Sequence, residues 1–361
     1  MKKELLIKTL AIGIILLFVC INVNPSLAIN NVKKISMPVS NGKTFYVGGN
    51  GTGNYTKIQD AIDNASDGDT VFVYDDNSPY YENVVVNKSI NLIGEDKNTT
   101  IIDGATNGNG VDISVDNVKI VGFTINNCSN GAGICLYSNN CIITDNIISY
   151  NIAGILIGIE TYYGSDSYEP TVIFNFGYNT ITNNLIIGNK NLGIGLSNEN
   201  NTINGNIISQ TQYGIMLMFA VANNLSNNFI SENEYGIFIV ASYSNVIYRN
   251  NISKNEKLGV SIFCTSLDKI LQNNFIKNGQ NAYFNQPILT RIQIFKNFLS
   301  LPIRGSTWNG NFWDRPRLMP CIVPGLISLI RGPIMEAPYH FNIFQFDRHP
   351  AKEPYDIPIV E

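Results

Sequence analysis

The sequence predicts an all-β protein whose main part is a single-stranded right-handed parallel β-helix, a solenoid of about 10 coils with about 22 residues each. An N-terminal α-helical cap and an irregular C-terminal cap are expected to close its ends. Three observations predict this fold. Asn and Ile contribute 52 and 53 of the 361 residues, a short motif recurs about every 22 residues, and apolar residues alternate within each repeat as in half-buried strands.

The composition excludes several other classes of protein. Charged residues make up 14% of the chain, well below the roughly 25% of an average soluble domain, and the chain is too apolar for intrinsic disorder. The 24 Lys and Arg nearly balance the 28 Asp and Glu. No charge excess attracts nucleic acid, so no nucleic-acid partner is expected.

Residues 1–28 predict a secretory signal peptide. Lys2 and Lys3 give it a positive start, an apolar run follows, and Ser26 and Ala28 place small residues at the cleavage positions. The apolar run is shorter than the ~20 residues of a membrane-spanning helix. Cleavage, with no membrane span afterwards, is favoured over a retained anchor. The mature chain is expected to be secreted, periplasmic or on the cell surface.

Residues 29–69 predict an N-terminal segment with a capping helix. Thr56 and Gln59 match a capping box, and Ile58, Ala61 and Ile62 follow at helical spacing. A helix over 56–66 is therefore expected to plug the N-terminal opening of the solenoid.

Residues 70–301 predict the β-helix itself. The unit Ile-x-x-Asn-x-(apolar)-x-x-Asn recurs, and Ile294 with Asn297 predicts a fainter last copy. The central Asn positions of the clear copies are Asn146, Asn184, Asn206, Asn228, Asn250 and Asn273. Asn tolerates left-handed backbone at bends, and its amide both donates and accepts hydrogen bonds. We therefore expect these residues to occupy the bends and to form a structural ladder from coil to coil.

An insertion near 161–175 interrupts the repeat. It contains Tyr162, Tyr163 and Tyr168 beside Asp166. Aromatic faces next to carboxylates suit sugar binding, and long loops on a rigid scaffold often carry function. These residues are a candidate ligand site, and an ordinary exposed loop is the structural alternative.

Residues 302–361 differ in character from the coils. Asn becomes rare there, while both Trp, both His and several Pro gather. We expect this tail to form a C-terminal cap that packs on the last coils, with a separate functional module as the alternative.

Several segments together resemble the opening and the end of known proteins. They are Gly68–Val71, Tyr81–Asn83, Ile90–Glu95, Thr100–Gly104 and Asn309–Trp313. The chain resembles secreted pectin-lyase-like β-helix proteins and, more narrowly, the NosD-type family that bears a periplasmic copper-binding label. The resemblance implies the fold over about residues 45–315, and its label implies copper. The Asp/Gly-rich segment that often follows the Trp motif in such proteins is absent here.

Candidate metal ligands are few. Copper favours Cys, Met and His, and Met216 and Met218 are expected to face outward from one strand by alternation with Ile215 and Leu217. His340 and His349 in the tail are further candidates, although they match no known ligand spacing. No cofactor is required by these residues; copper, or calcium as in lyases of this shape, is the alternative.

Enzymatic activity is the less favoured interpretation, and the sequence does not decide it. Sugar hydrolysis needs two carboxylates that flank the scissile bond, and Asp112, Asp116 and Asp145 are the sparse candidates within the coils. No His lies in the coil region. Solvated bends are the simpler explanation of these Asp residues.

Three functions are consistent with these residues. The first is an exported non-catalytic β-helix that binds a polysaccharide or another cell-envelope component, or that serves as a structural envelope protein. The second is a NosD-like copper-binding protein. The third is a polysaccharide lyase, hydrolase or epimerase. The sequence leaves the oligomeric state open.

Overall fold

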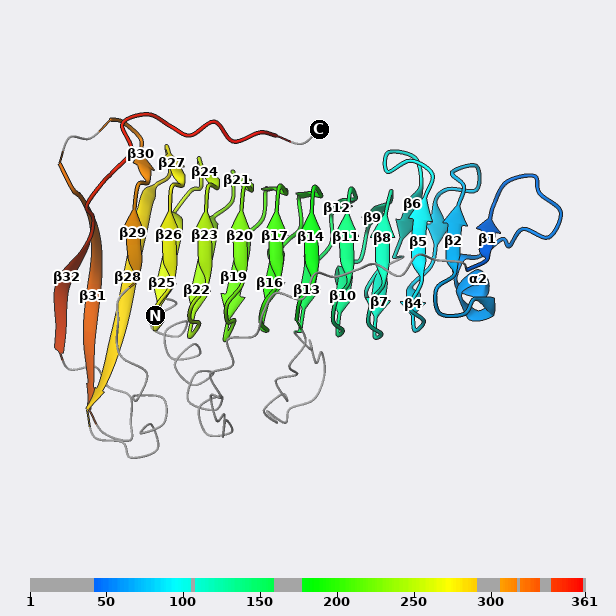
Figure 1. Ribbon diagram of the computed structural model, residues 1–361, viewed down its shortest axis with the longest axis horizontal. Coiled ribbons are helices and arrows are strands. Elements are labelled where there is room, and N and C mark those ends of the chain that lie inside the picture. The colour runs from blue at the N-terminus through cyan, green and yellow to red at the C-terminus, as the bar shows by residue number, and fades with distance from the viewer. Residues whose placement is uncertain are drawn as a thin grey trace.

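The computed structural model describes residues 42–104, 108–158, 177–290, 306–316, 319–331 and 339–359. Figure 1 shows one elongated parallel β-helix along which the coils follow each other in chain order. Three rows of strands run along it, and the predicted fold of about 10 coils is confirmed. The predicted signal peptide, residues 1–28, lies outside the described residues. Within the described ranges, no helix has the length and apolar character needed to cross a membrane.

The long-strand row pairs its members in parallel and is extended at the C-terminal end by one antiparallel strand, β32. Its strands are β4 Val84–Val86, β7 Val111–Ile113, β10 Ala132–Leu136, β13 Ala153–Ile157, β16 Leu192–Leu196, β19 Tyr213–Met218, β22 Tyr235–Val240, β25 Leu258–Phe263, β28 Gln280–Thr290, β31 Cys321–Arg331 and β32 Tyr339–Asp347.

The middle row follows the long strand of each coil. Its strands are β1 Thr44–Val47, β2 Thr70–Val73, β5 Asn91–Gly94, β8 Lys119–Val121, β11 Ile142–Thr144, β14 Thr180–Thr182, β17 Thr202–Asn204, β20 Asn224–Ser226, β23 Val246–Tyr248, β26 Lys269–Leu271 and β29 Thr307–Asn309.

The short-strand row forms a separate sheet of ten strands, one for each coil. Its strands are β3 Tyr80–Tyr81, β6 Ile101–Asp103, β9 Thr124–Asn126, β12 Ile147–Ser149, β15 Leu185–Ile187, β18 Ile207–Ser209, β21 Phe229–Ser231, β24 Asn251–Ser253, β27 Asn274–Ile276 and β30 Phe312–Trp313.

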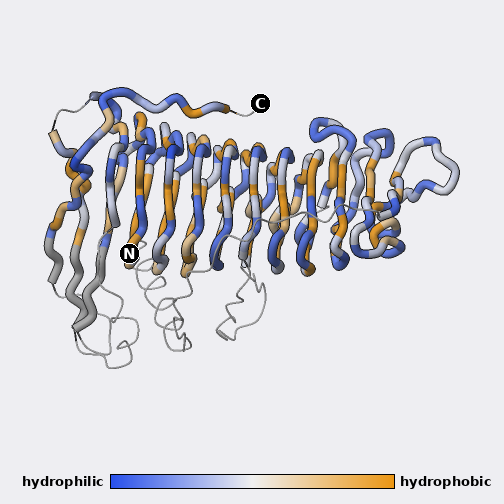
Figure 2. The backbone as a smooth tube through the Cα atoms, viewed as in Figure 1, coloured by the Kyte–Doolittle hydropathy of each residue, from blue (hydrophilic) through white to orange (hydrophobic). Residues whose placement is uncertain are grey.

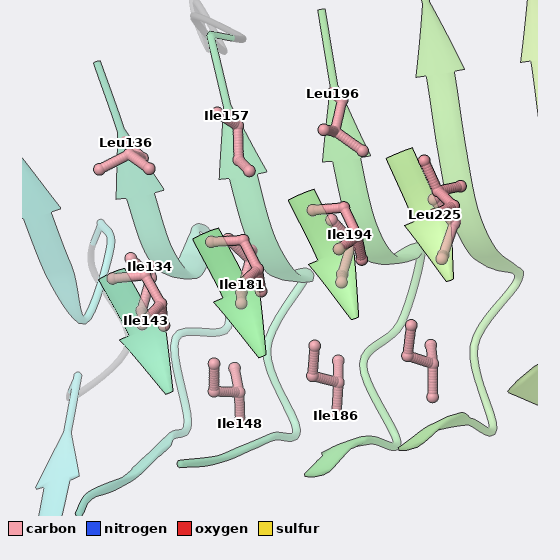
Figure 3. Packing of buried hydrophobic residues seen from close by; sticks show 14 of the residues in the cluster. Ile134, Leu136, Ile143, Ile148, Ile157, Ile181, Ile186, Ile194, Leu196 and Leu225 are labelled. Atoms are coloured by element: carbon pink, nitrogen blue, oxygen red, sulfur yellow. The ribbon is translucent and has the colours of Figure 1, made fainter. Parts of the chain in front are cut away.

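The interior is filled by aliphatic side chains that stack in register. Ile143 pairs with Ile181 in the middle row, and Ile148 pairs with Ile186 in the short-strand row. All four are fully buried, and Figure 3 shows such side chains repeated from coil to coil inside the solenoid. Apolar and polar segments alternate along every coil (Figure 2). One coil cannot bury its own apolar face, so the stack folds as one unit.

Asparagine ladders run through the bends, as the repeat predicts. In the central ladder, the backbone N–H and Nδ2 of Asn206 both donate to Oδ1 of Asn228, each at 3.0 Å, and Nδ2 also donates to the carbonyl of Ile181 at 2.9 Å. The same pattern links Asn146, Asn184, Asn206, Asn228, Asn250, Asn273 and Asn311. The ladder residue after Asn273 is thus Asn311, whereas the fainter copy with Ile294 and Asn297 lies outside the described residues.

The expectation that the ladder asparagines themselves hold the left-handed backbone at the bends is wrong. The left-handed residue is the one that precedes each ladder position, as at Asn227 (φ 54°), Arg249 (φ 52°) and Gln272 (φ 53°). Residues of several types hold that conformation. The ladder position therefore selects asparagine for its buried amide rather than for its backbone freedom.

The N-terminal helix is shorter than expected. Helix α2 spans Ile58–Asn64, its N-cap is Lys57, and no side chain of the N-cap residue bonds to it. The capping box of Thr56 and Gln59 is therefore wrong. The carboxylate of Glu82 caps the helix instead, because it accepts hydrogen bonds from the backbone N–H groups of Ile58 at 2.9 Å and Gln59 at 3.0 Å. The buried face of α2 joins the core beside the first coils.

The C-terminal cap is more regular than expected. Strands β31 and β32 form a long antiparallel hairpin at the end of the long-strand row (Figure 1). Pro324 of β31 lacks a backbone N–H group. The pairing of β31 with β28 begins only at the next residue, Gly325, so this ladder needs no donor from Pro324. The proline is therefore accommodated.

Candidate functional site

The Tyr-rich insertion lies outside the described residues. Tyr162, Tyr163, Asp166 and Tyr168 all fall within 159–176. The described residues stop at Gly158, just after β13, and resume at Gly177, which bridges to Glu199. Their role in sugar binding stays a prediction.

Met216 and Met218 lie on the outer face of β19. Both are half-buried, whereas the alternating Ile215 and Leu217 are fully buried in the core. The structure thus places the two thioethers on one side of one strand, as alternation requires.

The two histidines lie elsewhere. His340 is part of β32, where it pairs with Ser328 of β31. His349 follows that strand and is exposed, and its Nδ1 lies 3.0 Å from Oδ1 of Asn309. Strands β22, β25 and β28 separate β19 from this cap in the long-strand row, so the methionine pair and His349 form no common site.

A copper site needs more soft ligands than this strand offers. In the adjoining coils Met216 lies beside Gly195 and Phe238, and Met218 lies beside Val240, none of which binds copper. Across the ranges that the structure describes, no three His, Cys, Asp or Glu residues gather closely enough to hold a metal ion. The described residues alone therefore do not fit a copper site.

An aromatic cluster beside Met216 is the most distinctive outer feature of the long-strand row. The rings of Tyr213 and Tyr235 stack at 5.1 Å between centroids with 11° between their planes, and Phe238 packs against both. Lys257 holds its ammonium 5.2 Å from the centroid of the Tyr235 ring. Burial, reinforced by Tyr235 and Glu234, raises the pKa of the Tyr213 hydroxyl. It therefore stays protonated at neutral pH and remains a hydrogen-bond donor.

A polar hollow of about 390 Å³ adjoins this cluster at the bend between the short-strand and long-strand rows. Its lining is rich in charged and amide side chains, among them Lys190, Gln210, Gln212, Glu232, Glu234 and Lys254. The volume falls within the range of small-molecule sites. Sequence reasoning missed it, although Gln212, Glu234 and Glu256 follow one another at the repeat spacing directly after ladder positions.

Ion pairs between coils order the charges of the hollow. Lys257 forms a close ion pair with Glu234, and Lys254 lies 3.7 Å from Glu232. The hydrogen bond from Lys257 to Glu234 is the main reason that the pKa of this lysine is raised. Both pairs face solvent, so they orient the side chains more than they stabilise the fold.

The carboxylates considered for catalysis have separate partners. Asp112 accepts a hydrogen bond from Nδ2 of Asn109 at 2.7 Å, and burial raises its pKa. Asp116 binds Asn139, and Asp145 forms an ion pair of 2.7 Å with Lys97 on another side of the coil. Each of the three is held by a different neighbour, as expected for structural carboxylates.

Comparisons with known proteins bear on both fold and family. A family model described as "Periplasmic copper-binding protein (NosD)" matches residues 62–318. No curated protein matches the sequence.

Solved structures match in fold. The enzymatically active domain of bacteriophage CBA120 tailspike protein 2 gives a TM-score of 0.50 at 13% identity, over 80% of this chain and 47% of that chain. The A-module of the Azotobacter vinelandii mannuronan C-5 epimerase AlgE4 gives 0.41 at 14% identity, over 63% of this chain and 86% of that chain. At such identities the likeness concerns the fold alone.

Proposed function

The chain belongs to the NosD family, and from this premise we propose that it is an exported, non-catalytic β-helix protein that binds a polysaccharide of the cell envelope. The proposed site is the hollow that contains Gln212 and Glu234, together with the neighbouring edge of the long-strand row. The family description is periplasmic, which supports export and contact with envelope glycans.

The observation that carries this proposal is the gathering of amide, carboxylate and ammonium groups beside half-buried tyrosines. Sugar hydroxyls both donate and accept hydrogen bonds, and side chains such as Gln212 and Glu234 supply matching partners. Because the residues that line the hollow lie on successive coils, one extended ligand can contact several of them.

The geometry of the tyrosines predicts how a sugar is recognised. One face of the Tyr235 ring is stacked on Tyr213, and the ammonium group of Lys257 lies over the same ring. At Tyr235 a sugar therefore meets the ring edge and the hydroxyl rather than a free ring face. Binding is expected to depend on hydrogen bonds more than on stacking.

The test is a glycan array followed by calorimetry on the purified chain 29–361. We expect the double variant Gln212→Ala/Glu234→Ala to weaken binding of a hit by about tenfold or more. Lys269→Ala is the matched control, because Lys269 is exposed on β26 away from the hollow. An absence of hits counts against the proposal. Loss of binding in Tyr162→Ala/Tyr163→Ala, with the hollow variant unaffected, places the ligand on the insertion instead.

Copper binding is the alternative that the family description supports. The methionine pair on β19 places two thioethers on the outer face of one strand, although it lacks a third soft ligand beside it. An anaerobic Cu(I) titration of the parent and of Met216→Leu/Met218→Leu tests it. Binding tighter than micromolar that the double variant loses would favour this function over the first.

A further inference from the structure

A second ladder, which precedes the middle row of strands in each coil, contains a single acidic residue among its described members. This ladder runs before the middle row through Asn179, Asn201, Asn223 and Asn245, and it ends at Asp268. Asn245 donates the same hydrogen bonds to Asp268 that Asn223 donates to Asn245. Its backbone N–H donates to Oδ1 of Asp268 at 2.8 Å, and its Nδ2 donates to the same oxygen at 3.1 Å.

The second oxygen of Asp268 occupies the place of an amide nitrogen. In the two preceding members, Nδ2 of Asn223 donates to the carbonyl of Asn198 at 2.9 Å, and Nδ2 of Asn245 donates to the carbonyl of Ala220 at 3.0 Å. One coil further, the equivalent acceptor is the carbonyl of Ser242. The Oδ2 atom of Asp268 is buried and has no hydrogen-bond partner.

A negative charge does not suit this position. Asp268 has no exposed surface, and among the described residues an ionised Oδ2 would have only the Thr265 hydroxyl as a donor, which leaves the charge poorly compensated in an apolar interior. A proton on Oδ2 turns it into a donor and restores the pattern of the ladder. The Thr265 hydroxyl oxygen beside it is likewise buried without a partner of full hydrogen-bond geometry. This hydroxyl can accept from a protonated Oδ2 or donate to an ionised one, and its donation lowers the pKa of Asp268.

We propose that Asp268 acts as a protonated stand-in for asparagine, so that the coil built from β25, β26 and β27 is held more firmly in acid than at neutral pH. In an exported protein this makes the C-terminal part of the solenoid responsive to the acidity outside the cell.

The surroundings support this assignment. Burial is the largest cause that raises the pKa of Asp268 from its ordinary 3.8 to about 6, and it outweighs the donors of both Asn245 and Thr265, which lower it. The neighbouring Cys264 is neutral, because burial raises its pKa to about 11. In the packed elements β23 and β29, the titratable side chain is Tyr248, which lies against Arg249. Lys269 is exposed at the start of β26.

The sign of the effect follows from the raised pKa. Between about pH 4 and pH 6 the folded chain binds a proton at Asp268 that the unfolded chain has released. The contribution of this group to stability is therefore greatest in acid and is lost as the pH rises through this window.

The test compares the melting temperature of the full chain with that of Asp268→Asn at about pH 4 and about pH 7.5. We expect the variant to melt several degrees higher at neutral pH and to differ little in acid. The double variant Asn245→Asp/Asp268→Asn should move the same pH dependence one coil earlier. Asp145→Asn is the control, because Asp145 is exposed and paired with Lys97.

A second measurement does not depend on stability. The infrared carbonyl band of protonated carboxyl groups should be weaker in folded Asp268→Asn than in the folded parent at about pH 5, by the contribution of about one group, because the other carboxyl groups contribute equally to both. An equal effect of Asp268→Asn at both pH values overturns the proposal. A rise of the parent melting temperature with Ca²⁺ that Asp268→Asn abolishes also overturns it, because Oδ2 would then hold a cation.

Discussion

Asp347 closes the central ladder by receiving both donors of Asn311. Its Oδ2 accepts the backbone N–H of Asn311 at 2.8 Å and Nδ2 at 3.0 Å, and it also accepts the indole N–H of Trp313 at 3.1 Å. Its Oδ1 accepts the N–H groups of Gly310 and His349. The last β-strand thus supplies an acceptor where the repeat would have placed the next asparagine.

Asp347→Ala is expected to destabilise the C-terminal cap strongly. The substitution leaves several donors of the last coil buried without an acceptor, and each such group costs about 1–3 kcal/mol. We expect a loss of about 3 kcal/mol in unfolding free energy, measured by denaturant titration. Asp356→Ala in the same tail is the control, because Asp356 is exposed. Equal losses in the two variants would show that the carboxylate of Asp347 is not the closing group.

The interior of the ladder is expected to be as sensitive as its end. Asn228→Ala removes the acceptor of both Asn206 donors and the donor to the carbonyl of Ile203. We expect a loss of about 3 kcal/mol. Asn224→Ala, an exposed position on the same coil, should change stability by less than about 0.5 kcal/mol. Equal melting temperatures for parent and Asn228→Ala would refute the ladder as a stabilising element.

The sequence was sufficient for the features that repeat. Ile143 and Ile181, or Asn206 and Asn228, occupy equivalent positions of successive units, so the period alone places them in one column. The same period relates Tyr213 to Tyr235 and Gln212 to Glu234, and a column-by-column comparison of polar residues would have found the hollow.

Contacts that occur once were not visible in the sequence. Glu82 caps α2 from 24 residues away, and Asp347 reaches Asn311 from 36 residues away. No spacing rule relates such pairs, because they depend on how the chain enters the first coil and leaves the last one. Asn311 was missed as a ladder member because 38 residues separate it from Asn273 and a fainter copy of the motif, Ile294 with Asn297, lies between them in the sequence.

The tail after β32 is expected to loosen, without loss of the solenoid, when Asn274 is changed, while the Tyr355 hydroxyl still donates to the carbonyl of Gly310 and Arg249 still lies over the Tyr355 ring. Nδ2 of Asn274 donates to the carbonyl of Tyr355 and its Oδ1 accepts the N–H of Tyr355, both at 2.8 Å. Asn274→Ala should therefore make the tail a substrate for limited proteolysis, while the melting temperature changes little. Asn251→Ala is the matched control, because Asn251 is the neighbour of Asn274 in the same column. Equal proteolysis of both variants and the parent would count against this clasp.

The thiol of Cys128 is expected to be unreactive until the chain unfolds. The side chain is fully buried. Burial, reinforced by Asp103, raises its pKa from 9.0 to about 12. The thiolate is the reactive form, so at about pH 8 the shift alone lowers the rate of alkylation about 1000-fold. Mass spectrometry after iodoacetamide treatment should find Cys128 unmodified in the native protein and modified in denaturant. Rapid labelling of the native chain at this residue would mean that the N-terminal coils open far more readily than their buried core indicates.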